Sequence, residues 1–293
     1  MHVVVTPCRD EVSVIRNLIK SVSEQTVVPD SWIIVLHNYS QKSKEEIEVL
    51  TSDFDWISIH RINDNSEWKR GAQIAKIVNF GISQSNLEWE FLSKIDSDVE
   101  LPPNYFESIF SEFRESPDLG IASGSCYVLE RGRKIREKVS PDHTRGALKT
   151  YRKKCYEDIG GIGEVNGWDG IDNIKAQMNG WITKNFPRIE ARHFRRTGAY
   201  SGLVRGCFET GQFSYSMRYL PAYIFARSLH RMLRKPIIIG GLAMFTGYVA
   251  GFANGLPASC DPEVSDFLRM KQKRRLLFKG EVQSANSADL PSN

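Results

Sequence analysis

Two carboxylates stand one residue apart in the sequence Asp96-Ser97-Asp98, directly after an apolar run. Carboxylate oxygens in so compact an arrangement suit a hard cation such as Mg²⁺ or Mn²⁺, which keeps several waters and bridges to the phosphates of a substrate. The same three residues would also suit an aspartate-capped turn. The motif by itself does not decide between a metal site and a turn, so the elements around it matter.

Strand-like and helix-like segments alternate along the chain before this motif. Short apolar or β-branched runs, typical of buried strands, occupy residues 2–6, 32–36, 56–62 and 90–95. Helix-like patterns occupy residues 11–25, 44–50 and 71–85. This alternation predicts an α/β sheet with mainly parallel strands. Ligands of such open sheets bind beyond the carboxyl ends of the strands, so residues 6–9, 37–40 and 96–98 are expected to surround one ligand.

The pattern after residue 119 is mixed. It predicts a strand over residues 121–129, a strand or irregular segment over 147–156, a short helix over 169–179 and a last strand over 181–186. Asp169 is of a residue type that suits the N-cap of the short helix.

The composition bounds the class of protein. With 41% hydrophobic and 25% charged residues, the chain reads as globular, and not as collagen-like, coiled-coil or wholly disordered. Its five cysteines match no zinc or redox spacing, which favours a reduced compartment. The first residues do not read as a signal peptide. We therefore expect a cytoplasmic location for the predicted site.

Residues 236–257 form a run without a charged side chain, long enough to cross a bilayer. Arg231, Arg234 and Lys235 precede it, as cations do on the cytoplasmic side of membrane segments, and aromatic residues mix with arginines further upstream. Five glycines and Asn254 weaken a full span. The alternatives are an interfacial or re-entrant insertion, which we favour over a full span, and a buried helical hairpin.

Four blocks of the sequence together resemble family 2 glycosyltransferases of the GT-A fold. They cover roughly residues 2–200 and occur in the order of that family. They are VVVTPCRDE with LIKSVSEQ, RGAQIAKIVNFGI, LSKIDSDVELPPNY, and YRKKCYEDIGGI with GWDGIDNIKAQMNGW. The resemblance implies a Rossmann-like GT-A domain, a nucleotide-diphosphate sugar as donor, a divalent metal (Mn²⁺ or Mg²⁺) and inversion at the anomeric carbon.

The resemblance also implies a general base. The family carries an acidic pair eleven residues before the glycine of a Gly-Trp or Gly-Tyr motif, which here is Gly180-Trp181. Counting back places Asp169 in the position of the base, with Trp168 where the family usually has glutamate. Asp172, three residues further on the same helical face, is the second candidate. A simple helix-capping role for Asp169 remains the alternative.

Further residues are assigned to the donor and the metal. The resemblance implies that Asp98, together with Asp96, binds the metal. His193 would be a further metal ligand; the alternative is a structural histidine. Asn38 stands where the family has an aspartate that contacts the nucleobase of the donor, so the identity of that nucleobase is undetermined. The remaining candidates for the donor site are Thr6, Arg9, Lys76, Asp96 and Arg195. Lys76 and the arginines are equally compatible with a solvated surface.

The predicted protein is thus a glycosyltransferase for cell-surface polysaccharide or glycolipid synthesis, acting on a glycan or lipid-linked acceptor at the cytoplasmic side of a membrane. We expect a GT-A domain over residues 1–211, a helical, membrane-associated segment over 212–280 and a disordered tail over 281–293. The alternatives are a nucleotidyltransferase, which would need a glycine-rich loop after the first strand, and a non-catalytic membrane-bound module. The basic clusters would permit nucleic-acid binding, but no recognised module appears.

Overall fold

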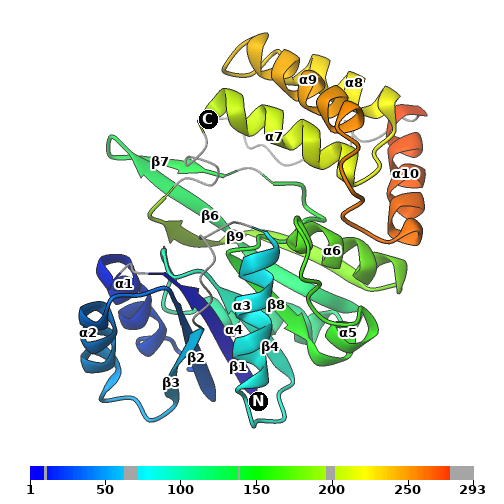
Figure 1. Ribbon diagram of the computed structural model, residues 1–293. Coiled ribbons are helices and arrows are strands. Elements are labelled where there is room, and N and C mark those ends of the chain that lie inside the picture. Colours follow the sequence, from blue (N-terminus) through cyan, green and yellow to red (C-terminus); the bar gives the residue numbers. More distant parts are fainter. Residues whose placement is uncertain (10–11, 63–70, 138, 196–201, 278–293) are drawn as a thin grey trace, which may run out of the picture. The chain divides into compact units, whose positions relative to one another are not determined.

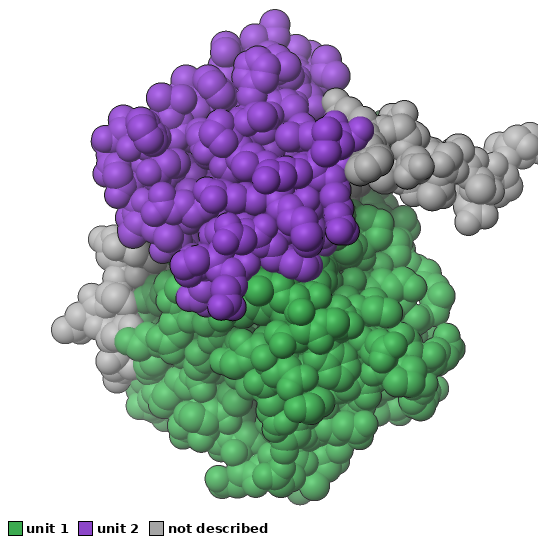
Figure 2. Space-filling model, turned by 90° about the vertical axis from the view of Figure 1, so that its right-hand side faces the viewer, with its two compact units in different colours: residues 1–197 green, residues 198–293 purple. Residues whose placement is uncertain are grey.

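The computed structural model describes residues 1–9, 12–62, 71–137, 139–195 and 202–277. The chain divides into two compact units, Met1–Thr197 and Gly198–Asn293 (Figure 2). All the residues assigned to the predicted site belong to the first unit. The tail predicted over residues 281–293 lies outside the described residues.

The first unit contains a mixed sheet in which the described strands follow the order β3-β2-β1-β4-β8-β6-β9-β5, with β7 paired to β6 (Figure 1). The strands are β1 (His2–Cys8), β2 (Ser31–His37), β3 (Ile57–Ile62), β4 (Phe91–Ile95), β5 (Val99–Glu100), β6 (Leu119–Glu130), β7 (Arg133–Arg136), β8 (Leu148–Arg152) and β9 (Ile182–His193). The block β3-β2-β1-β4 is parallel throughout. Antiparallel pairs join β8 to both β4 and β6, whereas β6 and β9 pair in parallel, so the described sheet is mixed rather than mainly parallel.

Helices cover both faces of this sheet (Figure 1). They are α1 (Val12–Ser23), α2 (Gln41–Thr51), α3 (Ala72–Ser83), α4 (Tyr105–Glu115), α5 (Lys153–Asp158) and α6 (Trp168–Met178). Side chains of a strand alternate between the two faces. Accordingly Val4 packs with α1, α2 and α4, while Val3 and Val5 pack with α3, α5 and α6. The sheet thus lies between two apolar layers, and the predicted α/β architecture with flanking helices is confirmed.

The predicted elements mostly occur, with corrections in the second half. Residues 147–156 divide into strand β8 and helix α5. The last strand continues to His193 instead of ending near residue 186, because it pairs with β6 and then with β5. The N-cap of α6 is Gly167, in a left-handed conformation, and Asp169 lies within the first turn. Asp169 therefore does not cap the helix.

The second unit is helical. Its described helices are α7 (Leu203–Ser216), α8 (Pro221–Arg231), α9 (Ile239–Ala253) and α10 (Pro262–Leu277). Helix α7 spans the position after Gly211 where the sequence suggested a domain boundary. Since α7 packs along α9, the compact unit includes the whole of α7.

The uncharged run becomes the turn before α9, α9 itself and the residues after it. No helix among those the structure describes combines the length and apolarity needed to cross a membrane. Glycines allow the close packing of α9 on α7: a Cβ at Gly247 of α9 would lie 2.1 Å from the carbonyl oxygen of Phe208, and a Cβ at Gly211 of α7 would lie 2.0 Å from the carbonyl oxygen of Met244. Glycines at both positions thus let α7 and α9 approach closely.

Candidate active site

The carboxyl ends of three parallel strands form one edge of the sheet. Strand β1 lies between β2 and β4 and runs parallel to both. Neighbouring strands are about 4.8 Å apart, so the segments that follow them are close to one another. Arg9, Asn38 and Asp96 follow β1, β2 and β4 respectively. The topology therefore gathers these segments at one edge, as the sequence predicted.

Asp98 lies within a cluster of cationic and imidazole groups. Its Oδ2 accepts a hydrogen bond from Nε of Arg195 at 3.0 Å, and its Oδ1 is 3.3 Å from Nε2 of His193. Burial alone would raise the pKa of the Asp98 carboxyl, but hydrogen bonds and charge interactions with His193 and Arg195 outweigh it and hold that pKa below its ordinary value. Asp98 is thus an ionised carboxylate in a largely buried position.

The other nitrogen of His193 faces a second carboxylate. Nδ1 of His193 is buried and lies 3.7 Å from Oε2 of Glu137, which also forms an ion pair with Arg145. The Cys126 thiol is close to both groups, and the three possible ligand atoms lie within 4.8 Å of one another. Burial raises the pKa of Cys126 to about 11, so the thiol is neutral near pH 7. A protonated thiol is a poor ligand for a hard cation.

Asp98 and His193 are placed as two ligands of one cation would be. Adjacent ligands of an octahedral Mn²⁺ or Mg²⁺ ion, each about 2.1 Å from the metal, are separated by about 3 Å. The 3.3 Å between Oδ1 of Asp98 and Nε2 of His193 is close to that separation. On the other side of the imidazole, Oε2 of Glu137 lies 3.7 Å from Nδ1 of His193, beyond hydrogen-bond distance, and this buried nitrogen has no hydrogen-bond partner among the described residues. The residues present therefore fit a divalent cation.

Asp96 is held by a buried lysine of the preceding strand. Nζ of Lys94 forms an ion pair with Oδ1 of Asp96 and donates a hydrogen bond to the carbonyl oxygen of Gly146 at 2.8 Å. The ammonium group also lies 5.5 Å from the centre of the Trp168 ring. Lys94 therefore connects the Asp96 carboxylate with the segment that approaches helix α6.

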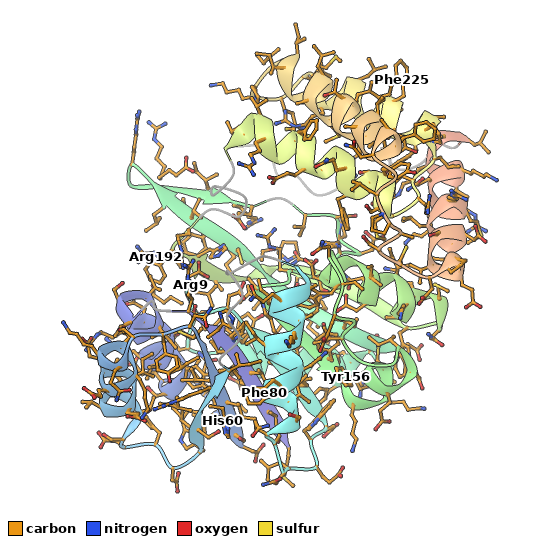
Figure 3. All side chains as sticks on the ribbon, viewed as in Figure 1. Arg9, His60, Phe80, Tyr156, Arg192 and Phe225 are labelled. Carbon is orange, nitrogen blue, oxygen red and sulfur yellow. The ribbon has the colours of Figure 1, made fainter. Side chains whose placement is uncertain are left out.

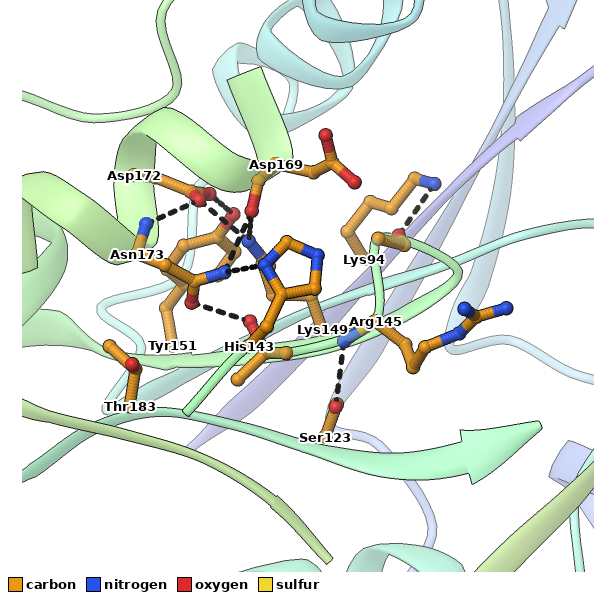
Figure 4. A network of polar contacts seen from close by, with 12 residues as sticks. Lys94, Ser123, His143, Arg145, Lys149, Tyr151, Asp169, Asp172, Asn173 and Thr183 are labelled. Atoms are coloured by element: carbon orange, nitrogen blue, oxygen red, sulfur yellow. Dashed lines mark hydrogen bonds and ion pairs between the residues drawn. The ribbon is translucent and has the colours of Figure 1, made fainter. Parts of the chain in front are cut away.

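Asp169 also lies next to Gly146. Its side chain is half-buried, and a Cβ at Gly146 would lie 2.9 Å from Oδ2 of Asp169. Within the described parts of the chain, no hydrogen bond or ion pair involves the Asp169 carboxylate, and Figure 4 shows it directed away from the neighbouring network. An accessible carboxylate without a partner is suited to accept a proton.

The backbone of Asp169, by contrast, is fixed. Its carbonyl oxygen accepts hydrogen bonds from Nζ of Lys149 at 2.5 Å and from Nδ2 of Asn173 at 2.8 Å. Lys149 also donates to Oδ1 of Asp172 at 2.6 Å, and the hydroxyl of Tyr151 donates to Oδ2 (Figure 4). Asp172 is 2% exposed and both its oxygens are engaged. The structure therefore does not favour Asp172 as a base; it anchors the helix that carries Asp169.

The remaining donor-site candidates lie in different surroundings. Thr6 is fully buried and its hydroxyl accepts a hydrogen bond from the indole of Trp32 at 2.9 Å, so its side chain belongs to the core. Arg9, labelled in Figure 3, is exposed after β1. Asn38 is exposed, with φ of 45°. Lys76 is an exposed residue of α3.

Several residues of the site were not predicted from the sequence. Lys94 and Lys149 stand directly opposite each other on β4 and β8, and each lies 5.5 Å from the centre of the Trp168 ring. Glu137 lies among arginines and lysines in the sequence, so no pattern marked it as a residue of the site. His143, whose Nδ1 is 3.4 Å from Nδ2 of Asn173, also borders the network. Burial and the neighbouring Lys149 lower the pKa of His143, which keeps its imidazole neutral near pH 7.

Comparisons with known proteins place this geometry in context. A model described as glycosyl transferase family 2 matches residues 3–165, more than half of the chain. The match ends before Asp169 and His193, so it says nothing of the roles of those two residues. No curated protein matches the chain.

Three solved structures are similar in fold. A mannosyltransferase, PcManGT, from Pyrobaculum calidifontis in complex with GDP-Man and Mn²⁺ has a TM-score of 0.57 and 14% identity, with 97% of this chain and 83% of that chain covered. TarS 1-349 from S. aureus has a TM-score of 0.55 and 14% identity, covering 99% and 75%. GalNAc-T7 with UDP, GalNAc and Mn²⁺ has a TM-score of 0.52 and 14% identity, covering 67% and 43%. At these identities the likeness establishes the fold alone.

The anchoring of α6 leads to a first prediction. Lys149→Met leaves the Asp172 carboxylate buried without its cation, which should lower the free energy of unfolding by about 3–5 kcal/mol. The double variant Lys149→Met/Asp172→Asn removes both charges and should recover most of that stability. Its turnover should nevertheless stay about tenfold or more below that of the unchanged protein, because Asp169 has lost a backbone anchor. Denaturant titration and turnover at saturating substrate measure the two effects.

The exposed pair of Lys154 and Asp158 on α5 provides the control. Lys154→Met/Asp158→Asn should change stability by less than about 1 kcal/mol and leave turnover unaltered. Full turnover in the Lys149→Met/Asp172→Asn variant would show that the buried pair serves only stability.

Proposed function

The chain belongs to glycosyl transferase family 2, and from that membership we propose that it transfers a sugar from a nucleotide-diphosphate donor to an acceptor hydroxyl with inversion at the anomeric carbon. The observation that carries the chemistry is the arrangement of two carboxylates about Gly146. Lys94 connects Asp96 with the carbonyl oxygen of Gly146, and the Asp169 carboxylate, which has no partner among the described residues, lies against the Cα of Gly146. One donor at the strand ends could thus meet an acceptor beside Asp169.

A divalent cation belongs to this proposal. Asp98 and His193 would hold Mn²⁺ or Mg²⁺, and Asp96 would contact the donor ribose or the cation through water. When bound, such a cation neutralises negative charge on the leaving diphosphate. Two of the similar structures contain Mn²⁺, which supports the choice of cation. One of them contains GDP-Man and the other UDP, so they do not indicate which nucleobase the donor carries.

The proton of the acceptor goes to Asp169 in this mechanism. As the acceptor oxygen forms its bond to the anomeric carbon, the bond from that carbon to the diphosphate breaks and the hydroxyl proton passes to the Asp169 carboxylate. The anchors from Lys149 and Asn173 keep the Asp169 backbone fixed during this step. Arg195 is placed beside Asp98 to contact the diphosphate, since a guanidinium recognises phosphate oxygens well.

The donor would extend across the strand ends towards the exposed residues there. Asn38 offers a donor and an acceptor for a nucleobase edge, and Arg9 and Lys76 offer positive charge to the phosphates. The hydroxyl of Thr6 is not proposed to contact the donor, because its side chain is fully buried and accepts a hydrogen bond from Trp32. No nucleic-acid partner is proposed.

The acceptor is proposed to be a glycan or a lipid-linked glycan in cell-surface polysaccharide or glycolipid synthesis, met at the cytoplasmic side of a membrane. This location is supported by the basic and apolar composition of residues 215–257. A lipid-linked acceptor is confined to the bilayer, so an enzyme attached to the same surface would meet it more often than one in solution.

A prediction about the cation tests the proposal. Asp98→Ala removes one of the two proposed ligands and should reduce Mn²⁺-dependent release of nucleoside diphosphate by about 100-fold or more. A screen of sugar nucleotides, with and without Mn²⁺, provides the measurement. Asp118→Ala, an exposed carboxylate outside the site, is the matched control and should behave as the unchanged protein. Undiminished Mn²⁺-dependent release by the Asp98→Ala variant would contradict the assignment.

A separate prediction concerns the base. Asp169→Asn preserves the shape of the side chain but removes its basicity, so turnover should fall by about 10²–10⁴-fold while the KM of the donor stays within a few fold. Steady-state kinetics with varied donor measure both quantities. Asp53→Asn, an exposed aspartate next to α2, should leave both unchanged. If Asp169→Asn turned over at the normal rate, the proton would have to go elsewhere.

A further inference from the structure

The turn between α8 and α9 exposes a group of apolar side chains. Leu233 is 78% exposed and Ile237 is 60% exposed, and neighbouring apolar residues of both helices are exposed to a similar degree. We call this group the apolar corner; it consists of Phe225, Leu229, Leu233, Ile237, Ile238, Ile239 and Leu242. Phe225, labelled in Figure 3, contacts Phe245 at a ring distance of 5.9 Å and so joins the exposed faces of the two helices.

Hydrogen bonds fix the conformation of the turn that exposes the apolar corner. The guanidinium of Arg231 donates hydrogen bonds to the carbonyl oxygens of Arg234 and Lys235, both at 2.8 Å. The backbone N–H of Ile238 donates to the carbonyl oxygen of Met232 at 2.9 Å. Ile238 has φ of 61°, a conformation that β-branched residues rarely adopt. Backbone strain of this kind persists where surrounding contacts enforce it, and it occurs preferentially at functional positions.

The stretch of chain that forms the apolar corner carries charge of one sign. No aspartate or glutamate occurs between Glu209 and Asp261, whereas this stretch contains five arginines and lysines. Arg231 is used to hold the turn, but Arg234 and Lys235 are exposed beside the three isoleucines. Exposed cations next to exposed aliphatic side chains match the two layers of an anionic bilayer surface, its headgroups and its acyl chains. The phosphates of a nucleic acid could pair with the cations, but a nucleic acid offers no apolar layer in which the aliphatic side chains could be buried.

We propose that the apolar corner docks on an anionic lipid bilayer, with its isoleucine and leucine side chains inserted below the headgroups and with Arg234 and Lys235 bound to lipid phosphates. This inference deepens the proposed membrane location and rests on it. It involves residues of the helical unit only, and none of them is assigned to the donor, the cation or the base. The docking places no helix across the membrane.

Flotation of the full chain with vesicles tests the apolar contribution. Vesicles of phosphatidylglycerol in an excess of phosphatidylcholine should carry the unchanged protein, and Leu233→Ser/Ile237→Ser should lower the bound-to-free ratio by about tenfold or more. Val49→Ser/Leu129→Ser replaces two exposed apolar residues of the first unit and should bind within about twofold of the unchanged protein. Equal losses in both variants would overturn the proposed place of docking.

The cationic contribution is tested with the same vesicles. Arg234→Gln/Lys235→Gln should lower binding to phosphatidylglycerol vesicles roughly thirtyfold, since each basic residue near such a surface contributes about a factor of five or more. Binding to vesicles of phosphatidylcholine alone should be weak for all forms and should not respond to this change. If the unchanged protein bound both kinds of vesicle equally, the charge argument would be wrong.

Release of nucleoside diphosphate as the sugar is transferred to a soluble acceptor separates this inference from the proposed function. The corner variants should retain that activity in the absence of vesicles and keep the thermal unfolding midpoint of the unchanged protein. An active protein that does not float with vesicles would overturn docking and leave the transferase proposal standing, whereas a protein that floats but releases no nucleoside diphosphate would do the reverse. Concentration-dependent dimerisation that Leu233→Ser/Ile237→Ser abolishes, without vesicle binding, would assign the corner to a second copy of the chain instead.

Discussion

The buried ion pair between Lys149 and Asp172 is the constraint on which the site depends. Both side chains are almost completely inaccessible, and separating either charge from the other would leave it desolvated in the interior. The pair therefore fixes α6 relative to β8, and Lys149 extends the constraint to the carbonyl oxygen of Asp169. A strand of the sheet thus determines where the proposed base stands. The carboxylate of Asp169 itself remains available for chemistry.

A second buried lysine relates the donor side to the acceptor side. Lys94 lies opposite Lys149 in the sheet, and two neighbouring ammonium groups would repel each other without compensation. Each has its own aspartate, Asp96 or Asp172, and the indole of Trp168 lies near both. An aromatic face attracts cations, which offers a physical reason for tryptophan where the family usually has glutamate. Charge compensation in the core and the placement of the site are therefore achieved by the same residues.

Hydrophobic patterning predicted the first half of the fold well, because strands such as β1 and β2 are short and apolar and the helices between them have one apolar face. The same logic placed Asp96 and Asp98 at a strand end. It could not identify Lys94, Lys149 or Glu137, since a charged residue reads as surface until its tertiary partner is known. It also could not separate helix packing from membrane insertion. Gly247 of α9 lies against the backbone of α7, and such a contact between two helices cannot be read from the hydropathy of one segment.

The central claim is a single displacement in which Asp169 activates the acceptor and the diphosphate leaves from the opposite face of the sugar. The most direct measurement is the anomeric configuration of the product, read from its proton NMR spectrum after transfer from a donor of known configuration. The account predicts that the new glycosidic bond has the configuration opposite to that of the donor. A product that retains the configuration of the donor would contradict the account, because it would require a different role for the Asp169 carboxylate.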